Sequence, residues 1–252
     1  MAAGAWRARS LTLSGALAAW AVGALILFGA GWAGGGVLAA FFVSSSLVSR
    51  LSAEPAIPDT TRLDSKGNRR DHAQVLANGG VAALAALVGL RDPTLGLWLV
   101  TGTLAAAAAD TWATSLGARS RVAPRLFWSG RPVPPGTSGG MTVLGTAGGA
   151  TGGLLVAASG ALAGGLPSLL PAATLIGFAG MVADSALGAV VQGRFYCPAC
   201  HLPSEWPVHR CATATLHRGG LAWLDNDGVN FAATALAAGL SFAAWAWLCP
   251  CS

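Results

Sequence analysis

Two aspartates lie inside strongly apolar stretches of the chain. Asp110 ends an alanine run in AAAAADTWA, and Asp184 lies in FAGMVADSALGAVV. An ionisable side chain within an apolar span is energetically costly, and such residues usually belong to functional sites. The alternatives are snorkelling to a membrane interface or a structural pair with an arginine. Aspartate has too short a side chain to snorkel well, so both residues are interpreted as site residues.

A further group of oxygen-bearing side chains lies in WLDNDGVNF, residues 223–231. One residue among Asp225, Asn226 and Asp227 is expected to cap the helix that follows. A single cap leaves the remaining carboxylate and the nearby Asn230 without a structural role. Magnesium prefers carboxylates together with substrate phosphates. The expected magnesium ligands are therefore Asp110, Asp184 and Asp227.

The segment PGTSGGMT, residues 135–142, is a candidate phosphate-binding turn. Thr137 or Ser138 can cap the next helix, while Gly139 and Gly140 let the chain turn. The same geometry presents free backbone N–H groups and the positive end of a helix, which bind phosphate well. Because three acidic sites accompany it, the segment is interpreted as a phosphate cradle. Basic residues would neutralise the remaining phosphate charge, namely Arg69, Arg70, Arg131 and Lys66.

The stretch FYCPACHLPSEWPVHRCATATLHRGG, residues 195–220, contains a C-x-x-C pair followed by histidine and a third cysteine. Three thiolates and one imidazole can hold a closed, structural tetrahedral zinc ion. The spacing is not a standard zinc-finger spacing, and a redox pair is the competing interpretation, although no thioredoxin-like context surrounds it. Both interpretations stay open for the loop 193–222. The candidate ligands are Cys197, Cys200, His209 and Cys211, with His201 and His217 as substitutes.

These residues require elements that hold them at a defined depth in a membrane. Of the 252 residues, 54% are hydrophobic and 10% are charged, whereas soluble domains carry about 25% charge. Seven apolar stretches reach the length of about 18 residues that a membrane-spanning helix needs. The sequence therefore predicts an all-α polytopic membrane protein with about seven transmembrane helices, in a single domain over residues 1–252. The expected spans are approximately 11–30, 32–49, 73–90, 94–115, 140–164, 169–192 and 228–248.

The basic residues are distributed unevenly between the two ends of these helices. Of the 15 lysines and arginines, only Arg91 falls on the side opposite the amino terminus. Under the positive-inside rule, the amino terminus and the three long loops are cytoplasmic, and the carboxy terminus lies outside. The net charge of +5 then reflects topology, and nucleic acid need not be invoked. The candidate site residues all fall at the cytoplasmic ends of their helices.

Six motifs occur in the order found in one integral membrane family. They are FFVSSSLVSR, RRDHAQVLANGGVAAL, ADTWATSLG, VPPGTSGGMTVLGT, ADSALGAVVQGRFYCPAC and WLDNDGVNF. Through them nearly the whole chain resembles the family that is grouped with transmembrane protein nineteen and was long labelled a domain of unknown function. That family includes the phytyl-phosphate kinase of tocopherol synthesis. The matching positions are Asn78, Asp110, Thr137, Ser138, Asp184, Asp227 and Asn230.

The resemblance implies a kinase that transfers a phosphoryl group from a nucleoside triphosphate, preferably CTP, to an isoprenoid monophosphate. It also implies catalytic roles for the three aspartates and for Asn78 and Asn230. This chain departs from the family pattern at Ser115, where the family usually has glutamate. If that glutamate contacts metal or nucleotide, a neighbouring residue must take its role or the activity weakens. The second span also lacks the family's usual basic run directly after SR.

Polar residues at one membrane face are typical of an enzyme that brings a water-soluble nucleotide and a lipid-tailed acceptor together for phosphoryl transfer. The competing hypothesis is a membrane transporter or lipid flippase that uses the same carboxylates. Transporter sites usually lie near the bilayer midplane, at broken helices, so the position at one face favours the enzyme. A non-catalytic scaffold is a third hypothesis. The expected location is the inner (cell) membrane.

Overall fold

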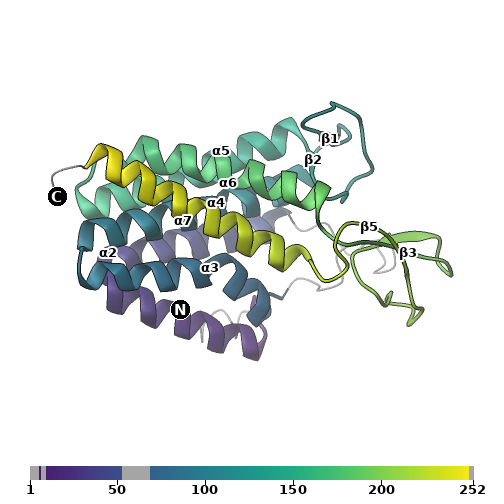
Figure 1. Cartoon of the computed structure of the whole chain (residues 1–252), viewed down its shortest axis with the longest axis horizontal. Coiled ribbons are helices and arrows are strands. Elements are labelled where there is room, and N and C mark those ends of the chain that lie inside the picture. Colours follow the sequence, from purple (N-terminus) through teal and green to yellow (C-terminus); the bar gives the residue numbers. More distant parts are fainter. Residues whose placement is uncertain (1–5, 7–9, 53–68, 250–252) are drawn as a thin grey trace.

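The computed structural model describes residue 6, residues 10–52 and residues 69–249. Long helices lie side by side, and short strands follow them at one end (Figure 1). The helices are α2 (Leu13–Ser52), α3 (His72–Ala86), α4 (Pro93–Gly117), α5 (Val143–Gly164), α6 (Leu169–Val190) and α7 (Asn226–Leu248), and the 3-10 helix η2 (Leu87–Leu90) continues α3. The prediction of a helical, polytopic membrane fold is confirmed.

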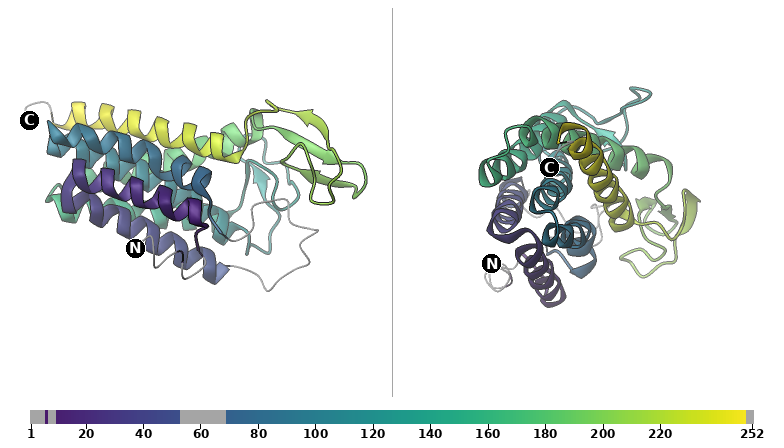
Figure 2. Two further views of the ribbon diagram at one scale, coloured as in Figure 1. Left: turned by 90° about the horizontal axis from the view of Figure 1, so that it is seen from below. Right: turned by 60° about the vertical axis from the view of Figure 1, so that its left-hand side comes forward.

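Helix α2 consists of two legs that fold back on each other at Gly31. The φ of Gly31 is 61° and its ψ is −157°, a conformation that residues with a side chain rarely adopt. The two legs run side by side (Figure 2). The predicted break between the spans 11–30 and 32–49 therefore lies at the correct residue.

Helix α4 is the centre of the bundle. Every residue from Leu95 to Ala109 is buried, and α4 packs against α2, α3, α5, α6 and α7. Small residues allow this close packing. A Cβ atom on Gly177 of α6 would lie 3.1 Å from Ala105, and one on Gly149 of α5 would lie 2.9 Å from the Ala109 carbonyl oxygen. The alanine run is thus a packing surface, and Asp110 is the first residue beyond it.

In the described part of the chain, five short strands lie at one end of the bundle, and the sequence had indicated none of them. β1 (Arg125–Leu126) pairs antiparallel with β2 (Gly140–Met141). β3 (Arg194–Cys197) lies between β4 (Leu202–Ser204) and β5 (Leu216–Gly219) in an antiparallel sheet. Because residues 140 and 141 belong to β2, α5 begins at Val143 and the predicted span 140–164 started too early.

The surface of the bundle suits a lipid environment. Among the residues that the structure describes, five helices are long and apolar enough to cross a bilayer, namely α2, α3 with η2, α5, α6 and α7. Large apolar side chains point outward, including Trp32 (88% exposed) and Trp247 (81% exposed). Interfacial tryptophans are typical of membrane proteins. The count of seven spans and the orientation of the termini stay predictions.

Candidate functional site

A cavity of about 970 Å³, here called the polar cavity, lies at the strand-bearing end of the bundle. Residues from all six long helices line it, so it is formed by the bundle as a whole rather than by one loop. It brings together most of the site residues predicted from the sequence. Those that line it are Arg70, Asn78, Asp110, Thr137, Ser138, Gly139, Gly140, Asp184, Asp227 and Asn230.

Asp110 and Asp184 approach the polar cavity from neighbouring helices. Asp110 comes from α4 and Asp184 from α6, and both line the cavity. The Oδ2 atom of Asp184 is buried and has no hydrogen-bond partner in the described part of the chain. A buried charged oxygen without a partner is costly unless a cation or proton accompanies it. This pair therefore fits a cation-binding role.

The start of α7 contributes a third carboxylate. Asp225 is the helix N-cap and accepts a hydrogen bond from the Gly228 amide at 2.9 Å, so its structural role is confirmed. Asp227 and Asn230 lie in the first turns of α7, are 9% and 7% exposed, and line the cavity. The cap of α7 is thus Asp225 alone, and the role of Asp227 and Asn230 in the site stays a prediction.

Thr137 and Ser138 do not cap the fifth helix. The N-cap of α5 is Thr142, whose side chain accepts a hydrogen bond from the Gly145 amide at 3.0 Å. The five residues Gly136–Gly140, here called the GTSGG turn, instead lead into β2, whose first residue is Gly140. The N-terminus of α5 therefore does not begin directly after this turn. Only the backbone amides of the turn itself remain as hydrogen-bond donors for a phosphate.

The GTSGG turn packs directly onto α6. Gly139 has a φ of 80°, and a Cβ atom there would collide with Ala189 and the Ser185 carbonyl. Within the turn, the amides of Thr137 and Gly140 donate to the carbonyls of Pro134 (3.2 Å) and Thr137 (3.0 Å). The amides of Ser138 and Gly139 have no acceptor among the residues that the structure describes. They are suited to bind an anion in the cavity.

The predicted basic residues separate into two groups. Arg70 lines the polar cavity, and no described residue accepts a hydrogen bond from its side chain. Burial lowers the pKa of the Arg70 guanidinium, although arginine remains protonated at physiological pH. Arg69 instead donates to the Leu11 carbonyl from Nη2 (2.9 Å) and Nε (3.3 Å). Neither Arg69 nor Arg131 lines the cavity, and Lys66 lies outside the described residues.

Several further residues line the cavity that were not predicted as site residues from the sequence. Ser115 lines the cavity where the resemblance implies glutamate, and its Oγ lies 3.1 Å from that of Ser49. Glu205 reaches the cavity from the loop 193–222, where it accepts hydrogen bonds from Gln192 Nε2 at 3.1 Å and Ser138 Oγ at 3.3 Å. Glu205 is the sole carboxylate of that loop in the sequence, which is the signal that could have identified it. Arg50 and Gln74 also line the cavity.

A second cavity, of about 290 Å³, lies between the two legs of α2 and α3 and is here called the apolar groove. Its walls are mostly apolar and include Trp20, Leu27 and Phe41. Three polar residues close one part of it, and the same three also line the polar cavity. The two cavities therefore meet at Arg70, Gln74 and Asn78.

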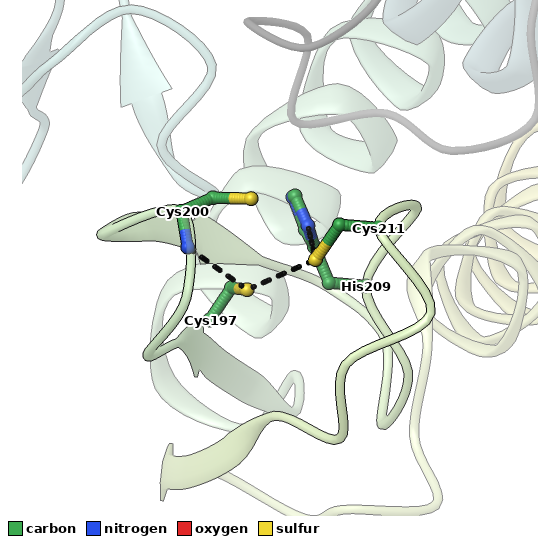
Figure 3. Close-up of side chains that lie close together, drawn as sticks. All are labelled: Cys197, Cys200, His209 and Cys211. Atoms are coloured by element: carbon green, nitrogen blue, oxygen red, sulfur yellow. Dashed lines mark hydrogen bonds between the residues drawn. The ribbon is translucent and has the colours of Figure 1, made fainter.

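The cysteine-rich loop brings its four candidate ligands into one cluster (Figure 3). The ligand atoms of Cys197, Cys200, His209 and Cys211 all lie within 4.8 Å of one another. His201 is not one of them. Hydrogen bonds with Thr213 and His209 lower the pKa of the Cys211 thiol to about 5. A hydrogen bond with Cys211 and burial raise the pKa of the Cys200 thiol to about 11.

The substitute ligands have other contacts. The Nδ1 atom of His201 lies 3.3 Å from the Tyr196 hydroxyl. The His217 ring packs against Phe195 with 5.3 Å between ring centroids. The structure therefore favours the four primary candidates and leaves no need for a substitute.

The chain matches the family described as integral membrane protein DUF92 over residues 1–238. It is 32% identical over 256 residues to Protein PGR of Arabidopsis thaliana, covering 90% of this chain and 86% of that protein. It is 31% identical over 188 residues to an uncharacterised membrane protein of Methanocaldococcus jannaschii, covering 75% and 77%. For an uncharacterised membrane protein of Synechocystis the identity is 28% over 227 residues, covering 88% and 78%. No solved structure matches the chain.

Proposed function

Since the chain belongs to the DUF92 family of integral membrane proteins, we propose that it is a membrane-embedded kinase of isoprenoid monophosphates. It transfers a phosphoryl group from a nucleoside triphosphate, with CTP as the expected donor, and forms the isoprenoid diphosphate. The reaction takes place at the cytoplasmic face of the cell membrane. Such an enzyme needs a polar site for the nucleotide and an apolar site for the lipid tail, and the two sites must meet at the phosphate.

This proposal rests on the fact that the polar cavity and the apolar groove share lining residues. Arg70, Gln74 and Asn78 line both spaces. A prenyl phosphate bound here would place its charged head against the Arg70 guanidinium and its tail between the legs of α2 and α3. Arginine suits phosphate recognition because its planar group donates several hydrogen bonds at once. A small polar ligand alone would have no use for the groove.

The polar cavity supplies what phosphoryl transfer requires. Catalysis of this reaction consists mainly of positioning the reactants and neutralising negative charge. Asp110, Asp184 and Asp227 would hold Mg²⁺, and the unpartnered Oδ2 of Asp184 fits this role. When bound, Mg²⁺ neutralises phosphate charge. The Ser138 and Gly139 amides would bind a phosphate of the nucleotide, with Asn78 and Asn230 orienting the reacting groups.

The transfer itself needs no base in the protein. An oxygen of the acceptor phosphate attacks the γ-phosphorus of the nucleotide and forms a new P–O bond. The bond from the γ-phosphorus to the oxygen that bridges to the β-phosphorus breaks, and the nucleoside diphosphate leaves. A phosphate monoester is already largely ionised at neutral pH, since its second pKa is about 6. Accordingly, none of the described residues that line the polar cavity is a histidine.

A product assay tests the proposed reaction. Purified protein in detergent, given Mg²⁺ and geranylgeranyl or phytyl phosphate, should form the prenyl diphosphate with at least one of CTP, ATP, GTP or UTP. The free prenyl alcohols should be much poorer acceptors, because they lack the phosphate that Arg70 would bind. Mass spectrometry of the extracted lipids measures the product. If no nucleotide yields a diphosphate and proteoliposomes instead move labelled lipid or cation across the bilayer, the protein is a transporter or flippase.

Two neighbouring glycines of α3 offer a matched test of the tail site. Gly79 lines the apolar groove, and Gly80 does not. A Gly79→Leu substitution fills the groove beside Val22, so turnover of geranylgeranyl phosphate should fall at least about 10-fold more than that of dimethylallyl phosphate. The Gly80→Leu variant adds the same side chain outside the groove and should keep the wild-type ratio. Equal ratios in both variants would place the tail elsewhere.

A further inference from the structure

Two tight turns of the loop 193–222 present the cysteine and histidine ligands from opposite sides. Cys197 is the last residue of β3, and the turn that leads to β4 contains Cys200. The second turn lies between Val208 and Ala214, which form an isolated antiparallel bridge. In this turn the His209 amide donates to the Thr213 carbonyl at 2.9 Å. Each turn thus delivers two ligands from a short, hydrogen-bonded segment.

The distances within the cluster suit a tetrahedral zinc ion. With zinc–sulfur bonds of about 2.3 Å, two sulfur ligands of one ion lie about 3.8 Å apart. The Sγ atoms of Cys197 and Cys211 lie 3.6 Å apart, and His209 Nδ1 lies 3.2 Å from Cys211 Sγ. The amide of Cys200 also points at Cys197 Sγ, at 3.5 Å. Three sulfurs and one imidazole form a complete structural ligand set.

The backbone next to the ligands is strained in a repeated way. His201 follows Cys200 and has a φ of 55°, while Ala212 follows Cys211 and has a φ of 60°. Residues with a side chain rarely adopt this left-handed conformation, and it persists only where the surroundings enforce it. The strain lies directly after the second ligand of each turn, where a bound metal would enforce it.

Two of the four ligands precede Glu205 in the sequence and two follow it, so the cluster joins the two ends of the segment that carries Glu205 to the polar cavity. Glu205 lies between the two turns and accepts hydrogen bonds from Ser138 of the GTSGG turn and from Gln192 beyond α6. We propose that Cys197, Cys200, His209 and Cys211 bind one structural Zn²⁺, and that this ion holds Glu205 against the GTSGG turn. Glu205 is then a positioning residue for Ser138, and the metal acts on the cavity only through it.

Metal analysis tests the zinc site directly. Protein purified without chelators should contain about one zinc per chain, and cobalt exchange should produce the absorption of cobalt–thiolate bonds. Cys200→Ser and Cys211→Ser variants should lose the zinc. The Cys249→Ser variant, which changes a cysteine at the opposite end of the bundle, should keep it. Wild-type protein without zinc, or with a disulfide between Cys197 and Cys200, would overturn the site, and this measurement requires no variant to fold.

Hydrogen exchange tests the link to the GTSGG turn. Removing zinc from the wild-type protein should increase amide exchange in residues 135–142, and restoring zinc should reverse the change. A Glu205→Gln variant should retain zinc and show the same increased exchange with the metal present. If zinc removal leaves exchange in residues 135–142 unchanged, the metal does not hold Glu205. Neither measurement depends on kinase activity. Both therefore test the zinc site even if the product assay shows that the proposed function is wrong.

Discussion

An Asp184→Asn variant should lose turnover by about 10³-fold or more while its thermal unfolding in detergent stays near that of the wild type. Asparagine keeps the shape of aspartate but removes the charge that would bind Mg²⁺. The folded state should tolerate the change, because Asp184 Oδ2 is buried and makes no hydrogen bond in the described part of the chain. Initial rates of prenyl diphosphate formation and a thermal melt measure the two effects.

The same substitution at Asp92 is the control for Asp184. Asp92 caps α4 at the opposite end of the bundle, where it accepts a hydrogen bond from the Leu95 amide at 2.9 Å. Asparagine caps helices about as well as aspartate, so Asp92→Asn should change neither turnover nor stability. Full turnover in Asp184→Asn would exclude Asp184 from the site. A variant that no longer folds would show that its role is structural.

An Arg70→Met variant should lose about 100-fold in kcat/KM for the prenyl phosphate, because a hydrogen bond to a charged group contributes about 1.5–3 kcal/mol. The KM for the nucleotide should change little, since Arg70 lies where the apolar groove meets the polar cavity. Methionine keeps much of the apolar stem of arginine. Varying each substrate at saturating concentrations of the other separates the two effects.

Arg131 provides the matched control for Arg70. It is exposed in the β1–β2 loop and does not line the polar cavity. Arg131→Met removes the same charge from the same end of the protein, so it should leave both KM values near those of the wild type. Equal losses in the two variants would indicate a general charge effect. A loss confined to the nucleotide KM would move Arg70 to the donor site.

The long elements of this fold could be predicted from the sequence because they depend on local composition. Apolar runs interrupted by glycine, proline or charge gave the helix boundaries to within a few residues, including the break at Gly31. The grouping of Asp110, Asp184 and Asp227 also followed, because helices of similar length that alternate in direction bring every second end to one face. All three side chains line one polar cavity, in agreement with that expectation.

The remaining features depend on contacts between distant segments. The strands are two to four residues long, which is too short for a periodic pattern, and their pairing depends on the loops around them. Arg69 and Arg70 are adjacent and chemically identical, so composition cannot show that only Arg70 faces the cavity. The choice of Thr142 over Ser138 as the α5 cap depends likewise on the pairing of β1 with β2.

The position of α4 in the bundle has a consequence for biosynthesis. The helix is surrounded by protein from Leu95 to Ala109, and it is not among the helices apolar enough by composition to cross a bilayer. Lipid therefore stabilises α4 less than it stabilises the helices around it. Three of its packing partners, α5, α6 and α7, leave the ribosome after it does. We therefore expect membrane insertion of α4 to depend on these later helices, so that a nascent chain truncated before α5 should retain it poorly.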